Sequence, residues 1–238
     1  MKNKLLLFIW LGAFTGHTTS WADRRSYVWT YEYMTMPGGE LELEYYLDYR
    51  APDWGDKSTA NWSHQIELEY GITDHWDLAL YQVFSQPNSG SYRYSEMKFR
   101  TRYRLFEAGL FVADPLLYLE LKRPSNSSDP NIFEGKFILA KEVRNFNLAG
   151  NFILERELIS GAEWEKEYAV GSNYQIIPAV KAGVEVTGNF NSGSENHTLG
   201  GPTFSFASER FFITAGALWG TNDQSDDFRF RYIIGLEL

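Results

Sequence analysis

The sequence predicts an all-β fold, a transmembrane antiparallel up-and-down β-barrel, and three observations lead to it. Apolar and polar residues alternate in repeated segments from residue 26 to residue 238. Side chains along a strand point to opposite faces, so each segment has one apolar and one polar face. The chain begins with a secretory signal pattern. Charges interrupt every later apolar run, and a chain without membrane helices can cross a bilayer only as a closed barrel. Together these observations indicate a barrel in a bacterial outer membrane.

Residues 1–22 have the three parts of a signal peptide. Lys2 and Lys4 provide the positive start, and residues 5–11 provide an apolar core. That core is shorter than the roughly 20 residues that span a bilayer. Ser20 and Ala22 place small residues where a signal peptidase inspects the chain. We therefore predict cleavage after Ala22.

The composition excludes several kinds of site and partner. The chain has no cysteine, so neither disulfides nor thiolate metal sites are available to it. Its net charge of −9 becomes −11 once Lys2 and Lys4 leave with the signal, which argues against a nucleic-acid partner. We expect no cofactor and no metal. The expected partners are outer-membrane lipid and small polar solutes, and the composition leaves the oligomeric state open.

Thirteen segments alternate in this way. In the second of them, Leu41 and Leu43 alternate with acidic Glu42 and Glu44, which is typical of a strand with one face in lipid and one in a polar lumen. The segments cover approximately residues 26–36, 40–50, 61–71, 75–84, 92–106, 114–123, 132–142, 146–157, 164–175, 179–190, 197–206, 211–220 and 228–238.

The connections between the segments alternate between tight turns and longer loops. Outer-membrane barrels have short turns on the periplasmic side and longer loops outside, so we place turns such as 37–39 and 72–74 in the periplasm. Thirteen strands would then close with a parallel pair, whereas bacterial single-chain barrels have an even strand number. We prefer twelve strands in a single barrel at 37–238, with 23–36 as a lumenal segment or an extra strand. Fourteen and ten strands are the alternatives.

Closure of a twelve-stranded barrel pairs the last strand with the strand at 40–50. We expect this pairing to place Arg229 and Arg231 near Glu42 and Glu44, since opposite charges on neighbouring strands attract.

The polar faces of the strands predict a lumen lined by charge. Arg100, Arg102 and Arg104 form a basic ladder on one strand, and guanidinium groups bind carboxylates and phosphates in a bidentate manner. Opposite charges inside a small barrel also pair simply to satisfy one another, so the ladder has a packing interpretation beside the functional one. The candidate pore-lining residues are Arg100, Arg102, Arg104, Lys98, Glu42, Glu44, Glu67, Glu69, Glu120, Arg229 and Arg231.

The sequence contains no recognisable catalytic set. After the signal, the histidines are His64, His75 and His197. Ser63 and His64 are neighbours on one strand, so they face opposite sides, and neither a G-x-S-x-G nor an H-E-x-x-H motif is present. We therefore predict that the protein is not an enzyme.

One turn resembles a known family. Residues 70–78 read YGITDHWDL, a pattern that resembles the turn of many uncharacterised bacterial outer-membrane β-barrel proteins. These are porin- or transporter-like proteins that are often labelled as phenol-pathway outer-membrane proteins. The resemblance implies the fold and the location, and it implies transport only weakly. It transfers no solute-binding residue. The terminal Leu238 departs from the Phe or Trp that usually ends such barrels.

Three functions are open on the sequence. The first is a channel for passive passage of small polar or charged solutes. The second is a closed structural or surface-interaction barrel whose loops at 51–60 and 124–131 meet partners, with Trp54 in the first loop. The third is an outer-membrane lipid-modifying enzyme. A soluble all-β protein of the periplasm is the alternative fold.

Overall fold

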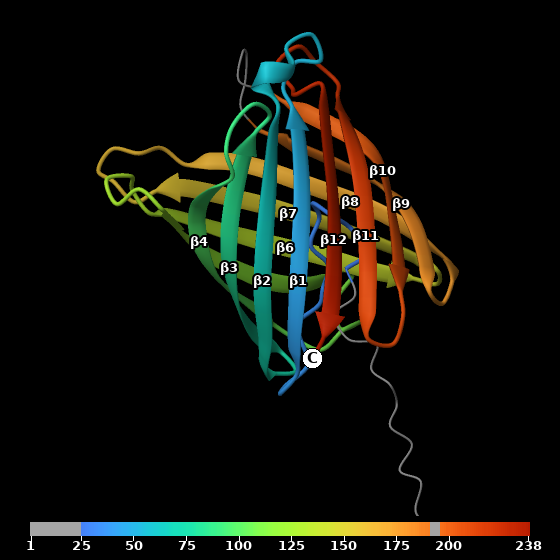
Figure 1. Ribbon diagram of the computed structural model, residues 1–238. Helices are drawn as coiled ribbons and strands as arrows, with labels where there is room; N and C mark the ends of the chain where they lie inside the picture. The colour runs from blue at the N-terminus through green and yellow to red at the C-terminus, as the bar shows by residue number, and fades with distance from the viewer. Residues whose placement is uncertain (1–24, 191–195) are drawn as a thin grey trace, which may run out of the picture.

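The computed structural model describes residues 25–190 and 196–238, and it is a closed barrel of twelve antiparallel strands (Figure 1). Each strand pairs with its neighbours in the chain, and β1 closes the barrel against β12. This confirms the predicted fold and strand number. The predicted signal peptide, its cleavage site and residues 191–195 lie outside the described residues. The strands are β1 (Leu41–Ala51), β2 (Asn61–Thr73), β3 (Trp76–Pro87), β4 (Arg93–Arg104), β5 (Asp114–Pro124), β6 (Ile132–Val143), β7 (Phe146–Glu157), β8 (Glu165–Ile177), β9 (Val180–Asn189), β10 (Thr198–Ala207), β11 (Phe211–Gly220) and β12 (Phe228–Glu237).

The alternation of the sequence appears directly as two faces of the wall. On β2, Glu67 and Glu69 are 1% and 2% exposed, whereas Ile66 and Leu68 are each 44% exposed. The apolar side chains therefore form the outer surface, and the charged side chains face inward, which is the reverse of a water-soluble barrel. The only helix in the described part of the chain is η1 (Lys57–Thr59). No helix there is long and apolar enough to cross a membrane.

The connections distinguish the two ends of the barrel. At one end, which we call the short-turn end, tight turns such as 144–145 and 178–179 join the strands. At the other, the long-loop end, the connections include 125–131 and 221–227. Residues 105–113 depart from this division, because this longer connection between β4 and β5 lies at the short-turn end.

The predicted charge match at the closing seam is wrong. In the antiparallel register, Arg231 lies opposite Asp48 and Arg229 lies opposite Arg50. Glu42 and Glu44 instead lie opposite Glu237 and Gly235, at the far end of the seam. The start of one antiparallel strand meets the end of its partner, so the two arginines near the start of β12 cannot reach the acidic start of β1.

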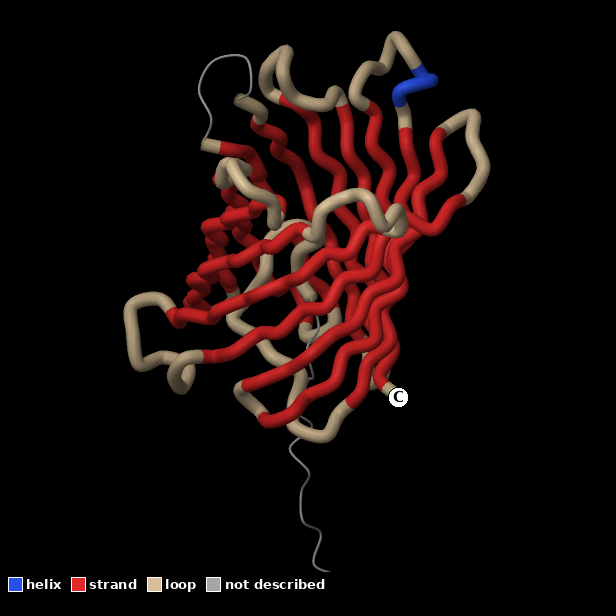
Figure 2. Tube along the Cα trace, turned by 90° about the vertical axis from the view of Figure 1, so that its left-hand side faces the viewer, coloured by secondary structure: helices blue, strands red, loops and turns tan. Residues whose placement is uncertain are grey.

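Residues 25–36, which we call the N-terminal segment, form no strand. They run inside the ring of strands from the short-turn end and turn back to reach Pro37, as Figures 1 and 2 show. Tyr27, Val28 and Met36 are fully buried. The core of the protein therefore consists of this segment packed against the inner wall.

Candidate functional site

The carboxylate of Glu185 holds the bend of the N-terminal segment. Glu185 lies on the inner face of β9 and is fully buried. Its two oxygens accept hydrogen bonds from the backbone nitrogens of Val28, Trp29 and Thr30 at 2.9, 2.9 and 2.7 Å. Three successive N–H groups that converge on one carboxylate form an anion-binding nest, and such charge-assisted bonds are stronger than neutral ones. The strand wall thus supplies the charge that shapes the segment.

Other strands anchor the segment on either side of this bend. Asn151 of β7 accepts from the Tyr31 nitrogen at 2.6 Å and donates to the Tyr31 oxygen at 2.9 Å. The Met36 nitrogen donates to Asp77 of β3 at 3.0 Å. Gly171 of β8 leaves room for the Tyr27 ring, since a Cβ there would stand 2.5 Å from Tyr27 Cε1. Anchors on three different strands tie the segment to opposite sides of the lumen.

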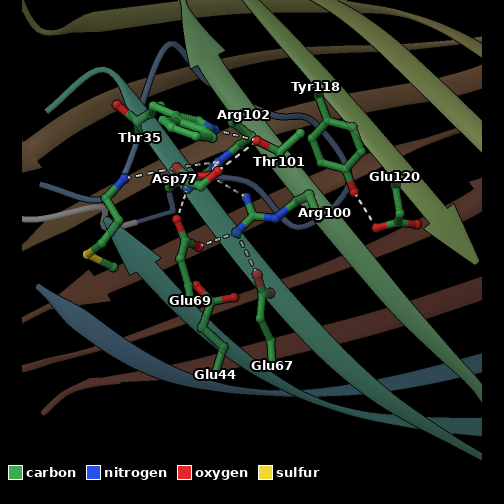
Figure 3. A network of polar contacts seen from close by, with 12 residues as sticks. Thr35, Glu44, Glu67, Glu69, Asp77, Arg100, Thr101, Arg102, Tyr118 and Glu120 are labelled. Atoms are coloured by element: carbon green, nitrogen blue, oxygen red, sulfur yellow. Dashed lines mark hydrogen bonds and ion pairs between the residues drawn. The ribbon is translucent and has the colours of Figure 1, made fainter. Parts of the chain in front are cut away.

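Two residues of the predicted arginine ladder, Arg100 and Arg102, lie in a buried ionic network (Figure 3). Arg100 binds Glu67 and Glu69 at 2.7 and 2.6 Å, and Arg102 binds Asp77 at 2.8 Å and also contacts Glu69. Arg100 is 1% exposed and Arg102 is 3% exposed. The guanidinium groups of these two residues therefore bind the wall of the barrel and are closed to a solute.

This network depends on a small residue in the strand between its members. Ala79 of β3 lies between Glu69 of β2 and Arg100 of β4 in the strand register. Its methyl group leaves the inner face open at this point, so the acid and the base meet across β3. Asp77 joins the network to the N-terminal segment through its bond to Met36.

The remaining sequence-predicted residues fall into three groups. Glu42 and Glu44 are buried in the wall. Glu120, which accepts a hydrogen bond from Tyr118 at 2.6 Å, lines a cavity together with Lys98, Arg229 and Arg231, as described next. Arg104 lies toward the short-turn end and donates to the backbone oxygen of Asp74.

A cavity of about 240 Å³ occupies the lumen between the N-terminal segment and the long-loop end, and we call it the upper cavity. Trp29 and Tyr31 of the segment form part of its lining. Its charged lining comprises five basic and three acidic residues, together with His197. These charged residues are Lys98, Lys122, Lys136, Arg229, Arg231, Glu120, Glu134 and Glu167. Four more carboxylates, those of Asp48, Glu96, Glu155 and Asp226, form ion pairs with the basic ones.

A second cavity, of about 360 Å³, lies on the other side of the N-terminal segment. Glu32, Tyr33 and Met34 of the segment line it together with Arg104. The two cavities share no lining residue, and the segment contributes to both. The segment therefore stands between two halves of the lumen.

Sequence reasoning did not identify the residues that hold the segment. Glu185 is the one acidic residue in the small and apolar strand β9, which is a signal that could have marked it. Asp77 follows the 72–74 turn and belongs to the family-resembling pattern at residues 70–78, which assigns it no contact with the segment. Asn151 carries no such signal, because one inward asparagine is common in a polar lumen.

The three histidines among the described residues lie apart from one another. His64 faces outward and bonds Tyr45 at 2.7 Å, and His75 bonds Glu107 at 3.0 Å at the short-turn rim. His197 lines the upper cavity, with its Nε2 4.0 Å from Glu167. The arrangement does not unite two of them in one site.

An ionic contact at the rim of the long-loop end joins a loop to the closing seam. Asp226 accepts from Arg50 Nε at 2.7 Å and from Arg229 Nε at 2.6 Å. Burial of Asp226 opposes its charged form, but the bonds and charges of Arg50 and Arg229 outweigh burial and lower the pKa of this carboxyl below its ordinary value. The unfolded chain has an ordinary aspartate pKa of about 3.9.

The lowered pKa of Asp226 sets the direction of a pH effect. The contact stabilises loop 221–227 fully above about pH 4, and this contribution is lost as the pH falls through the lowered pKa. We expect the backbone amides of this loop to lose hydrogen-exchange protection as the pH falls below about 4, and Asp226→Asn to lack that protection already near pH 5. Asp223→Asn, in the exposed part of the same loop, is the matched control. Equal protection of the two variants would contradict the assignment.

Comparison with known proteins gives similarity in fold. No family model matches the chain, and no curated protein matches it in sequence. The structure is similar to an outer-membrane channel from Pseudomonas putida F1, with a TM-score of 0.58 and 12% identity over 89% of this chain and 100% of that one. It is also similar to the NanC porin, with a TM-score of 0.54 and 10% identity over 82% and 98% of the two chains. The translocator domain of the autotransporter NalP from Neisseria meningitidis has a TM-score of 0.52 and 10% identity over 84% and 89%. The chain therefore has the fold of bacterial outer-membrane barrel proteins.

Proposed function

We propose that this chain is an outer-membrane channel for small polar or charged solutes, with its short-turn end in the periplasm and its lumen gated by the N-terminal segment. The observation that carries the proposal is the division of the lumen into two cavities by a segment that belongs to no strand. A displaced segment would join the upper cavity to the one beneath it. The paired strands of the wall need not move for this, because their ladder bonds do not involve the segment.

The charge of the lumen supports passage of solutes that carry charge. Rings of charged side chains set the selectivity of a pore at close range, and eight charged residues line the upper cavity. The similarity in fold to an outer-membrane channel and to a porin is in keeping with the proposal.

We expect the refolded mature protein in a planar bilayer to show rare, brief current steps that favour anions. Rarity follows from the anchored segment, and the preference follows from the guanidinium groups of Arg229 and Arg231 that line the upper cavity. Single-channel recording in a salt gradient measures both. Current with a cation preference would contradict the assigned charge of the pathway. Absence of current in the wild type, and also in the released-segment variant described in the Discussion, would contradict the channel.

A closed structural barrel is the second candidate, and one observation favours it. The buried network of Arg100 and Arg102 with three carboxylates fills part of the lumen with wall contacts. The same recordings distinguish the two functions, because a structural barrel stays closed when the segment is released.

A further inference from the structure

We propose that the upper cavity is a binding site for a small organic anion, a carboxylate carried on a flat apolar body. Arg229 and Arg231 would bind the carboxylate, and Trp29 and Tyr31 would meet the flat body. The assignment deepens the proposed channel function and rests on it, since it names the class of solute that would occupy the pathway.

Two arginines on one strand offer donors to the cavity. Arg229 uses its Nε for Asp226 at 2.6 Å, and its two terminal nitrogens make no hydrogen bond within the described part of the chain. Arg231 uses its Nε for Asp48 and one terminal nitrogen for the Val28 oxygen at 2.9 Å. Its other terminal nitrogen has no partner among residues 25–190 and 196–238. Three donor nitrogens therefore remain for a ligand.

The spacing and exposure of these arginines suit a shared ligand. They are two residues apart on β12, so they point to the same face about 7 Å from each other along the strand. Their side chains are 30% and 23% exposed, against 1% for Arg100. A guanidinium group binds a carboxylate through two parallel hydrogen bonds, so either arginine can hold the ligand and the other can add to its charge.

The lysines of the cavity are engaged by acidic residues. Lys122 and Lys136 each bind Glu134 at 2.9 Å, and Lys98 lies 3.5 Å from Glu96. The preference of the cavity for an anion over a neutral solute of the same shape therefore rests on the guanidinium nitrogens of Arg229 and Arg231, because they donate charge-assisted hydrogen bonds.

The floor of the cavity is aromatic. The rings of Tyr31 and Tyr118 lie 4.9 Å apart between centroids, and the Arg231 guanidinium carbon lies 5.6 Å from the centre of the Trp29 ring. Arg25 and Lys136 lie over the Tyr31 ring, 4.3 and 4.6 Å from its centre, so a flat ligand would meet these rings edge to face. Small-molecule sites combine such aromatic walls with a few polar groups that fix orientation. The donors and the floor therefore select for a carboxylate with a planar apolar part.

Occupancy of this site bears on the segment directly. Arg231 touches both the cavity and the backbone oxygen of Val28, and Trp29 and Tyr31 of the segment form part of the lining. The site is therefore complete only while the segment is docked. Binding of the anion and docking of the N-terminal segment are then coupled, and each favours the other.

The test uses benzoate as the probe and the refolded mature protein in detergent, with binding measured by isothermal titration calorimetry. We expect benzoate to bind, acetate to bind more weakly because it lacks the flat body, and neutral benzyl alcohol to give no signal. Arg229→Gln should weaken benzoate binding about tenfold or more, because it removes a charge-assisted bidentate pair. Arg229→Lys keeps the charge but loses the two parallel donors of the guanidinium group. Its affinity for benzoate should therefore lie between those of the wild type and Arg229→Gln.

The control is Arg156→Gln, since Arg156 faces outward over the Trp164 ring and should leave binding unchanged. Heat-modifiable migration on a gel verifies that each variant is folded. Equal binding of benzoate and benzyl alcohol, or unchanged affinity in folded Arg229→Gln, would overturn the proposal. Conductance without benzoate binding would refute the site and leave the channel in place. Benzoate binding without conductance in any variant would refute the channel and leave the site.

Discussion

Replacement of Glu185 by glutamine is expected to raise the open fraction of the barrel about a hundredfold. The carboxylate of Glu185 accepts three backbone hydrogen bonds from the N-terminal segment, and the amide removes its charge and one of its acceptor oxygens. Hydrogen bonds to charged groups contribute about 1.5–3 kcal/mol each, so a combined loss of about 3 kcal/mol corresponds to roughly a hundredfold change in the equilibrium. Single-channel recordings should show long openings in place of brief ones.

A chemical probe can test the same release without current. The chain has no cysteine, so Ser26→Cys introduces a single thiol at a buried position of the segment. An aqueous maleimide should label this thiol slowly in the parent chain and much faster when Glu185→Gln is added. Glu157→Gln, at an exposed glutamate on β7, is the matched control. Equal labelling rates in all three proteins would show that Glu185 does not hold the segment.

Replacement of Arg100 by methionine is expected to destabilise the folded barrel by about 3–5 kcal/mol, the usual cost of breaking a buried ion pair from one side. The substitution leaves Glu67 and Glu69 buried without their shared cation. Denaturant unfolding in lipid vesicles, followed by tryptophan fluorescence, measures the loss. Arg123→Met, at an arginine that bonds Asn131 near the long-loop rim, should change stability by less than about 1 kcal/mol.

A compensated variant separates the charge imbalance from the loss of packing. When Glu67→Gln and Glu69→Gln are added to Arg100→Met, no buried charge is left unpaired at this point, and most of the lost stability should return. If the triple variant is no more stable than Arg100→Met alone, the network is held by packing and the ionic explanation is wrong. The ion preference of any folded Arg100 variant should match that of the wild type, because this side chain is closed to the lumen.

The sequence predicted the wall of the barrel better than its interior. Strict alternation along segments such as 40–50 determines the number of strands and the face that each side chain takes, because both follow from the two-residue period of a strand. The two-residue period does not tell which residues of β1 and β12 lie opposite one another when the barrel closes. The expected match of Arg229 and Arg231 with Glu42 and Glu44 failed for this reason.

The role of the arginine ladder could not be read from alternation either. The pattern places Arg100 and Arg102 on the inner face, but their partners Glu67 and Glu69 are on β2, which is not a neighbouring strand. The contact exists because Ala79 leaves a gap on the strand between them. Whether a lumenal arginine binds the wall or a solute depends on such cross-strand neighbours, and the sequence period does not contain them.

The position of the N-terminal segment could not be predicted from its own residues either. Residues 26–36 alternate as a strand does, so the period alone left a lumenal position and an extra strand both open. Glu185 on β9 and Asn151 on β7 hold the segment in the lumen, and both are far from it in the chain.

The bend held by Glu185 also has a consequence for the order of assembly. Its three hydrogen bonds join residues that are 155 to 157 positions apart, and closing so long a loop early is entropically costly and slow. Docking of the segment must therefore wait until β9 has taken its place, although the segment precedes every strand in the chain. A segment that leaves the ribosome before every strand is in this way among the last to reach its native position. An assembling barrel carries an unpaired carboxylate inside until that step completes.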